Sequence, residues 1–202
     1  MLRRALAVFA VASTLSAPAH AAEPSDPEAL LASESEAARR WYYTWTIFFG
    51  LATVTEGALA NAATDHDDRV KYSVGTVMSG LGFLSTVVIP PPSGFAHLKL
   101  RSMPTTTEEE RAARRAEARR ILERARDEQR LGRSALAHGV NLAANAGAGL
   151  VIWKGYGNLT NGLFAFVSGT AVGELKIWTQ PSAFLDLELA PTAGGATLRG
   201  RF

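Results

Sequence analysis

Four long apolar segments constrain this chain more than any other feature of its sequence. Each approaches the length of about 20 residues that a helix needs to cross a bilayer. The segments cover residues 41–60, 72–90, 134–153 and 159–178. Only the second is free of charged and amide side chains. Apolar segments of this length predict helices that pack on one another or face lipid, and so an all-α fold.

Turn signals separate these segments into helices. The breaks are TDHDDR at 64–69, three prolines at 90–92 and YGN at 156–158. A loop is expected over 93–106. The expected helices cover, in order, residues 37–63, 70–89, 108–153 and 159–179. The sequence therefore predicts a bundle of four mainly apolar helices over 37–181, which we expect to be membrane-embedded.

The first half of the third helix, residues 108–133, is a long charged extension. Thr107 and Glu110 have the spacing of a capping box, which predicts a helix start at 108. This half carries seven acidic and nine basic residues. Pairs at i,i+4, such as Glu110–Arg114 and Arg119–Glu123, favour a solvated helix. Contact of its basic side chains with anionic lipid headgroups is the weaker interpretation, because acids are interleaved with them.

The last residues, 182–202, alternate apolar and polar side chains around the turn signal PTAGG. Folded as antiparallel strands, they place Leu187 opposite Leu198 and Asp186 opposite Arg199. Both pairings are favourable across two strands. We therefore expect a short C-terminal β-hairpin or tail after the helical bundle.

The first 21 residues have the pattern of a secretory signal peptide. A positive MLRR start, a short apolar run and the small-x-small end at 19–21 predict cleavage after Ala21. Residues 22–36, which include two prolines, are expected to be a flexible lead-in. The chain has no cysteine, so neither a disulfide nor a lipidated cysteine is possible. We expect an exported protein of the bacterial cell envelope, membrane-associated, or periplasmic if the helices do not span.

Charge gives no reason to expect a nucleic-acid partner. The whole chain has 21 basic and 19 acidic residues, and removal of Arg3 and Arg4 with the signal peptide leaves 19 of each. The expected partners are membrane lipid and either a second copy or another envelope protein.

Two observations favour membrane spans, and one opposes them. The tryptophans lie at segment ends, as in an aromatic belt, at positions 41, 45, 153 and 178. Small residues recur at i+4, which lets helices approach closely. These rows comprise Gly139, Ala143 and Gly147 in the third helix, and Ala165, Gly169 and Gly173 in the fourth. Against four spans, a cleaved signal would leave the strongly basic segment 91–133 outside, contrary to the positive-inside rule.

A polar seam is the main candidate site. His138, Asn141 and Asn145 are spaced i, i+3, i+7 and share one face of a helix. The short turn at 154–158 makes the third and fourth helices antiparallel, so Glu174 is expected level with His138 and Asn141. If the first helix runs parallel to the third, Glu56 is expected level with Asn145 or Gly147. The seam is expected either to fix helix register or to line an ion path.

No enzyme signature accompanies this seam. The sequence has no nucleophile elbow, Walker loop, dinucleotide fingerprint or zinc spacing. The acidic turn around His66 lacks the spacing of a calcium loop. We expect no catalytic residue, metal or cofactor. The first hypothesis is a structural or assembly protein, and the alternatives are a small transport bundle using Glu56 and Glu174, or a soluble periplasmic helical binding protein.

Overall fold

The fold is an all-helical bundle with six α-helices in the part of the chain that the structure describes. The computed structural model describes residues 26–181, 186–192 and 195–201. The helices are α1 (Pro27–Ala62), α2 (His66–Val88), α3 (Pro92–Arg101), α4 (Glu108–Gly132), α5 (Ala135–Leu150) and α6 (Leu159–Trp178). A π-helical turn, Val151–Gly155, extends α5. The expected signal peptide and its cleavage site lie outside the described residues.

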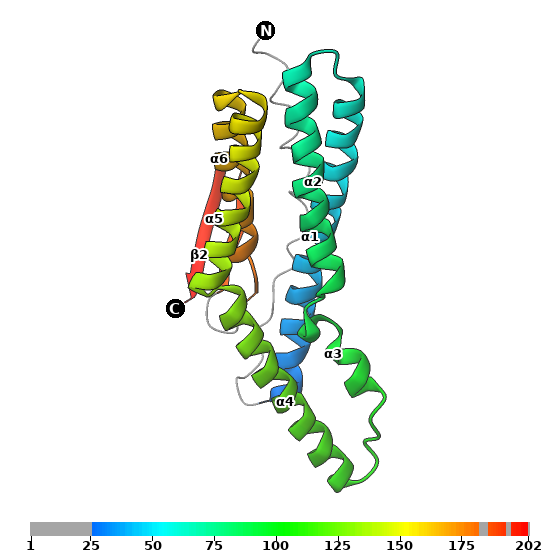
Figure 1. The fold of residues 1–202 in the computed structure, drawn as a ribbon. Coiled ribbons are helices and arrows are strands. Elements are labelled where there is room, and N and C mark those ends of the chain that lie inside the picture. The colour runs from blue at the N-terminus through cyan, green and yellow to red at the C-terminus, as the bar shows by residue number, and fades with distance from the viewer. Residues whose placement is uncertain (1–25, 182–185, 193–194, 202) are drawn as a thin grey trace.

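Two helical hairpins make up one end of the molecule. The packed pair α1 and α2 and the packed pair α5 and α6 lie next to one another in Figure 1. We call residues 41–62 of α1 together with α2, α5, the π turn and α6 the apolar half. Residues 27–40 of α1, with α3 and α4, form the other end, which we call the charged half (Figure 1).

The start of α1 corrects the expectation of a flexible lead-in over 22–36 for residues 27–36, which are helical, whereas residues 22–25 lie outside the described residues. Asp26 caps the helix by accepting a hydrogen bond from the backbone N–H of Glu28, and Pro27 occupies the first turn, where proline is tolerated. Leu31 is 1% exposed and belongs to the core of the charged half. That core contains Leu31, Ala96, Leu100, Ala118 and Leu122. Burial of Leu31 against α3 and α4 therefore orders a segment whose two prolines suggested flexibility.

The helix α3 replaces the first part of the loop expected over 93–106, whereas residues 102–106 belong to no helix or strand. Pro92 opens it, and Ser93 is tied to α1 because Ser35 donates a hydrogen bond of 2.6 Å to its carbonyl oxygen. Lys99 reaches α4 through a 2.6 Å ion pair with Glu117. The hydrogen bond from Lys99 holds the pKa of the Glu117 carboxyl below its usual value. The three prolines thus end one helix and begin the next.

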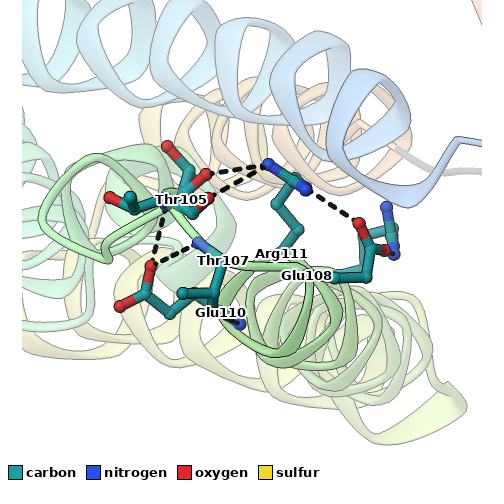
Figure 2. Close-up of polar contacts among 7 residues, drawn as sticks. Thr105, Thr107, Glu108, Glu110 and Arg111 are labelled. Atoms are coloured by element: carbon teal, nitrogen blue, oxygen red, sulfur yellow. Dashed lines mark hydrogen bonds and ion pairs between the residues drawn. The ribbon is translucent and has the colours of Figure 1, made fainter.

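The capping box at the start of α4 is confirmed. The hydroxyl of Thr107 accepts the backbone N–H of Glu110, and the Glu110 carboxylate accepts the N–H of Thr107 (Figure 2). The expected pair of Glu110 with Arg114 is not formed, because Arg114 lies 2.9 Å from the carboxylate of Glu28 in α1. Glu110 is engaged in the helix cap and Arg114 in a tertiary ion pair, so the local pair between them does not form.

One long helix over 108–153 was expected, and the structure divides it. The helix α4 ends at Gly132, and Ser134 caps α5 by accepting the N–H of Ala137. At the break, the Arg133 guanidinium donates to the carbonyl oxygen of Trp178, the last residue of α6, and to that of Gln180, just beyond it. Arg133 therefore joins the start of one hairpin helix to the end of the other.

The strands β1 (Asp186–Thr192) and β2 (Gly195–Arg201) pair with Leu189 opposite Leu198 and Glu188 opposite Arg199. This register is shifted by two residues from the expected one, so Asp186 lies opposite Arg201. A two-stranded hairpin alone is marginally stable in water. The C-terminal hairpin therefore stays a prediction.

Large apolar side chains point outward over the whole apolar half. They include Ile47, Leu51, Val54, Val77, Leu81, Leu84, Val140, Leu142, Leu163, Phe164 and Val167. By length and hydropathy, one helix in the described part of the chain, Ala135–Gly155, is suited to cross a membrane. The helices α2 and α3, bent by 41°, would make a second if they are taken as one span.

Candidate functional site: a polar seam between α5 and α6

The polar seam lies between α5 and α6, which a short turn makes antiparallel. Gly157 adopts a φ of 75° in that turn, a conformation that glycine takes without steric cost. Asn158 then caps α6 by accepting the N–H of Asn161 at 2.9 Å. This tight connection fixes which residues of the two helices lie at the same depth.

Three of the expected residues meet at Glu174. Oε2 of Glu174 lies 2.6 Å from Nδ1 of His138, and Oε1 accepts Nδ2 of Asn141 at 2.9 Å. Because a carboxylate only accepts, the bond to His138 requires the proton on Nδ1. The contacts that the sequence predicted among these three side chains are therefore confirmed.

Asn145 extends the seam into α5. Its Nδ2 donates to the carbonyl oxygen and to Oδ1 of Asn141, at 2.8 and 2.9 Å. Asn145 is buried, with 7% of its surface exposed. The side chains of His138 and Glu174 keep 31% and 30% of their surface exposed. The seam is thus open at the end near α4 and closed at its inner end.

The glycines of α6 make room for these amides. An added Cβ at Gly169 would overlap Oδ1 of Asn145, and one at Gly173 would overlap Oδ1 of Asn141. The small-residue row of α6 therefore receives the polar face of α5, which brings the two helices close together.

The row on α5 has a different surrounding, which corrects the expectation of close packing there. An added Cβ at Gly139 or Gly147 would meet nothing within 4 Å. The close approach of the two helices occurs instead at Gly149 and Gly162. A Cβ on Gly149 would lie 2.7 Å from the carbonyl oxygen of Gly162, and the reverse distance is 2.6 Å.

Glu56 does not join the seam. It faces α2, where its carboxylate accepts the hydroxyl of Ser79 at 2.8 Å and lies against Gly75. The sequence placed Glu56 level with Asn145 or Gly147 on the condition that the first helix runs parallel to the third, and it did not specify which helix the carboxylate faces. In the structure α1 packs along α2, because the turn between them is short.

Sequence reasoning missed the contacts that join the two hairpins. Near the charged half, the indole N–H of Trp41 donates to the carbonyl oxygen of Lys176, and that of Trp45 donates to Thr179 Oγ1. At the far end, Nδ2 of Asn158 donates to the Asp67 carboxylate at 2.6 Å. The positions of the tryptophans in the sequence indicated the ends of the apolar segments, but they did not indicate these hydrogen-bond partners.

The described residues contain no cluster of three or more histidine, aspartate or glutamate side chains that would hold a metal ion. Comparison of the chain with models of protein families, with curated proteins and with solved structures found no match.

Proposed function

We propose that this protein is a non-enzymatic structural or assembly protein of the cell envelope whose apolar half is embedded in a membrane. The observation that supports the proposal is the outward-facing apolar surface of α1, α2, α5 and α6. Soluble monomers rarely expose continuous apolar patches of more than a few hundred Å². Lipid tails would cover this surface without any further protein.

The positions of the tryptophan indoles and of the charged residues along the molecule also support a membrane location for the apolar half. The indoles of Trp41, Trp45 and Trp178 lie where the apolar half meets the charged half, and Trp153 lies at the opposite end. Tryptophan is enriched at both membrane–water interfaces. The dense charges of α4 are then outside the hydrocarbon region.

Within this proposal, the seam fixes the register of α5 against α6. From His138 to Asn145 it extends over eight residues, about 10 Å along the helix axis, compared with about 30 Å of hydrocarbon. Beyond Asn145 the backbones of Gly149 and Gly162 are in contact. A short, closed row of amides suits a structural role better than a transport path, and Glu56 lies on the other hairpin.

The remaining parts of the proposal rest on the sequence. Export to the envelope follows from the expected signal peptide, and a C-terminal hairpin from the alternating pattern of 182–202. Assembly with a second copy or another envelope protein is proposed because no enzyme signature was found.

The membrane proposal is tested by washing cell membranes with alkaline carbonate. The protein is expected to stay in the pellet. A Val167→Lys variant, at an outward position on α6 that is 61% exposed, should lose membrane insertion, since a central lysine costs roughly 2.5–3.5 kcal/mol in a bilayer. The matched variant Ala112→Lys, at an exposed position of α4, should insert normally. Release of the unaltered protein into the supernatant would instead identify a soluble bundle.

A further inference from the structure

Lys176 has an unusual position for a cation. It lies near the end of α6, at the level where Trp41 meets the same helix, and its side chain points toward α2 and α1 and away from the seam. Its ammonium lies 5.2 Å from the ring centre of Phe49 and 5.9 Å from that of Trp41. The cation is thus held against two aromatic rings at the boundary of the apolar half.

Two hydroxyl groups bind this ammonium. Nζ of Lys176 donates to Thr86 Oγ1 at 3.1 Å and to Ser85 Oγ at 3.2 Å. Both hydroxyls give their own protons to the carbonyl oxygen of Gly82, at 2.8 and 2.9 Å. Their oxygens are therefore oriented as acceptors, and an ammonium with three N–H groups keeps one donor for another acceptor.

Among the residues that the structure describes, no carboxylate forms an ion pair with this ammonium. The sequence has no acidic residue between Asp68 and Glu108 or between Glu128 and Glu174, and Glu174 is bound to His138 and Asn141 on the other side of α6. A partly buried cation without an anion is costly, so an anionic ligand would be stabilised here.

The place of the site in the fold limits what that ligand is. Thr86 is buried, but Ser85 is exposed, so the site opens to the surface of the molecule. It opens at the boundary where, under the proposed function, phospholipid headgroups lie. We propose that Lys176, whose ammonium is held in place by Ser85 and Thr86, binds the phosphate group of an anionic phospholipid through its remaining N–H donor. This inference rests on the proposed membrane location.

Lipid-dependent stabilisation tests the site. The protein in a neutral maltoside detergent is titrated with phosphatidylglycerol, and the midpoint of thermal unfolding is followed by circular dichroism. Phosphatidylglycerol should raise the midpoint, whereas phosphatidylcholine, which has no net charge, should have little effect. Lys176→Gln should raise the half-saturating phosphatidylglycerol concentration by roughly tenfold, the ratio expected for loss of one charge-assisted hydrogen bond.

The matched control is Lys154→Gln. Lys154 also lies over a tryptophan ring, 4.0 Å from the centre of Trp153, at the other end of the apolar half, but no hydroxyl contact was found for it in the structure. This variant should respond like the unaltered protein. An equal response of Lys176→Gln and the unaltered protein would overturn the site, even if Lys176→Gln unfolds at a lower temperature without lipid.

Inorganic phosphate separates the two sources of the anion. Stabilisation by phosphate alone, lost in Lys176→Gln, would overturn the lipid source and identify a soluble phosphate compound. Carbonate release would show that the proposed function has failed. A protein that stays in the membrane but shows no Lys176-dependent response would show that only this inference has failed.

Discussion

At the scale of single residues, the seam shows how far helical geometry alone determines a contact. His138 and Asn141 could be placed beside Glu174 because the period of 3.6 residues in α5 and in α6, with the short turn between them, fixes the positions of all three along the helix axes. Glu56 was not assigned its partner, because it faces Ser79 across its own hairpin of α1 and α2 and does not face the seam. Lys176 gave no signal in the sequence, since its partners, Ser85 and Thr86, are 91 and 90 positions away.

The hydrogen bonds to Glu174 lead to a stability prediction. His138→Leu should destabilise the protein by about 1–3 kcal/mol, because it removes a donor from a carboxylate that is only partly exposed. Adding Asn141→Leu and Glu174→Leu should recover part of this loss, since the whole polar set is then replaced by apolar groups. Thermal unfolding in detergent measures both effects.

Val140→Ala, at an exposed position of the same helix, is the control and should change stability by no more than about 0.5 kcal/mol. If the triple variant were less stable than His138→Leu alone, the three polar side chains would stabilise the fold more than apolar side chains do in the same places. The seam would then be more than a satisfied polar network.

At the scale of helices, the sequence predicted the apolar segments and the capped start of α4, but not every boundary. The break before α5 was missed because apolar and charged stretches can continue one helix, and only Ser134 marks the new start. The first turns of α1 and the whole of α3 were missed because their order comes from packing on α4. Local propensity is weak evidence where tertiary burial decides.

The contrast between glycines yields the second prediction. Gly162→Ala should destabilise by at least about 1 kcal/mol, because its Cβ would lie 2.6 Å from a backbone oxygen that cannot move without separating the helices. Gly147→Ala should be neutral or stabilising by up to about 1 kcal/mol, since its Cβ enters open space and alanine favours helix. The midpoints of thermal unfolding in detergent provide the comparison. Equal losses in the two variants would argue that a second helix, from another molecule, covers Gly147.

At the scale of the whole molecule, the separation into an apolar and a charged half was only partly visible beforehand. The sequence predicted where the charges lie along the chain, and four apolar helices with them. It did not predict that residues 27–40 would extend α1 beyond the hairpins and form a core with α3 and α4. That arrangement requires contacts between residues far apart in the sequence, which periodicity does not encode.

The two halves make the orientation in the membrane measurable. The chain contains no cysteine, so single cysteines report one position each. Under the proposed export, Glu109→Cys in α4 should react with an impermeant maleimide in intact spheroplasts, and Thr64→Cys, in the turn between α1 and α2, should react only after permeabilisation. Both positions are exposed in the structure. The opposite pattern would place the charged half inside, as the positive-inside rule favours, and would rule out a cleaved signal.

The core of the charged half also determines an order of events during synthesis. Leu31 completes its packing only against Leu122, which the ribosome adds 91 residues later. At about 5–20 residues per second, this delay is roughly 5–18 s. The hairpin of α1 and α2 closes through local contacts well within that time. During this delay Leu31, in the amino-terminal turns of α1, remains exposed. A chaperone that binds apolar segments therefore has more time to bind there than elsewhere in the chain.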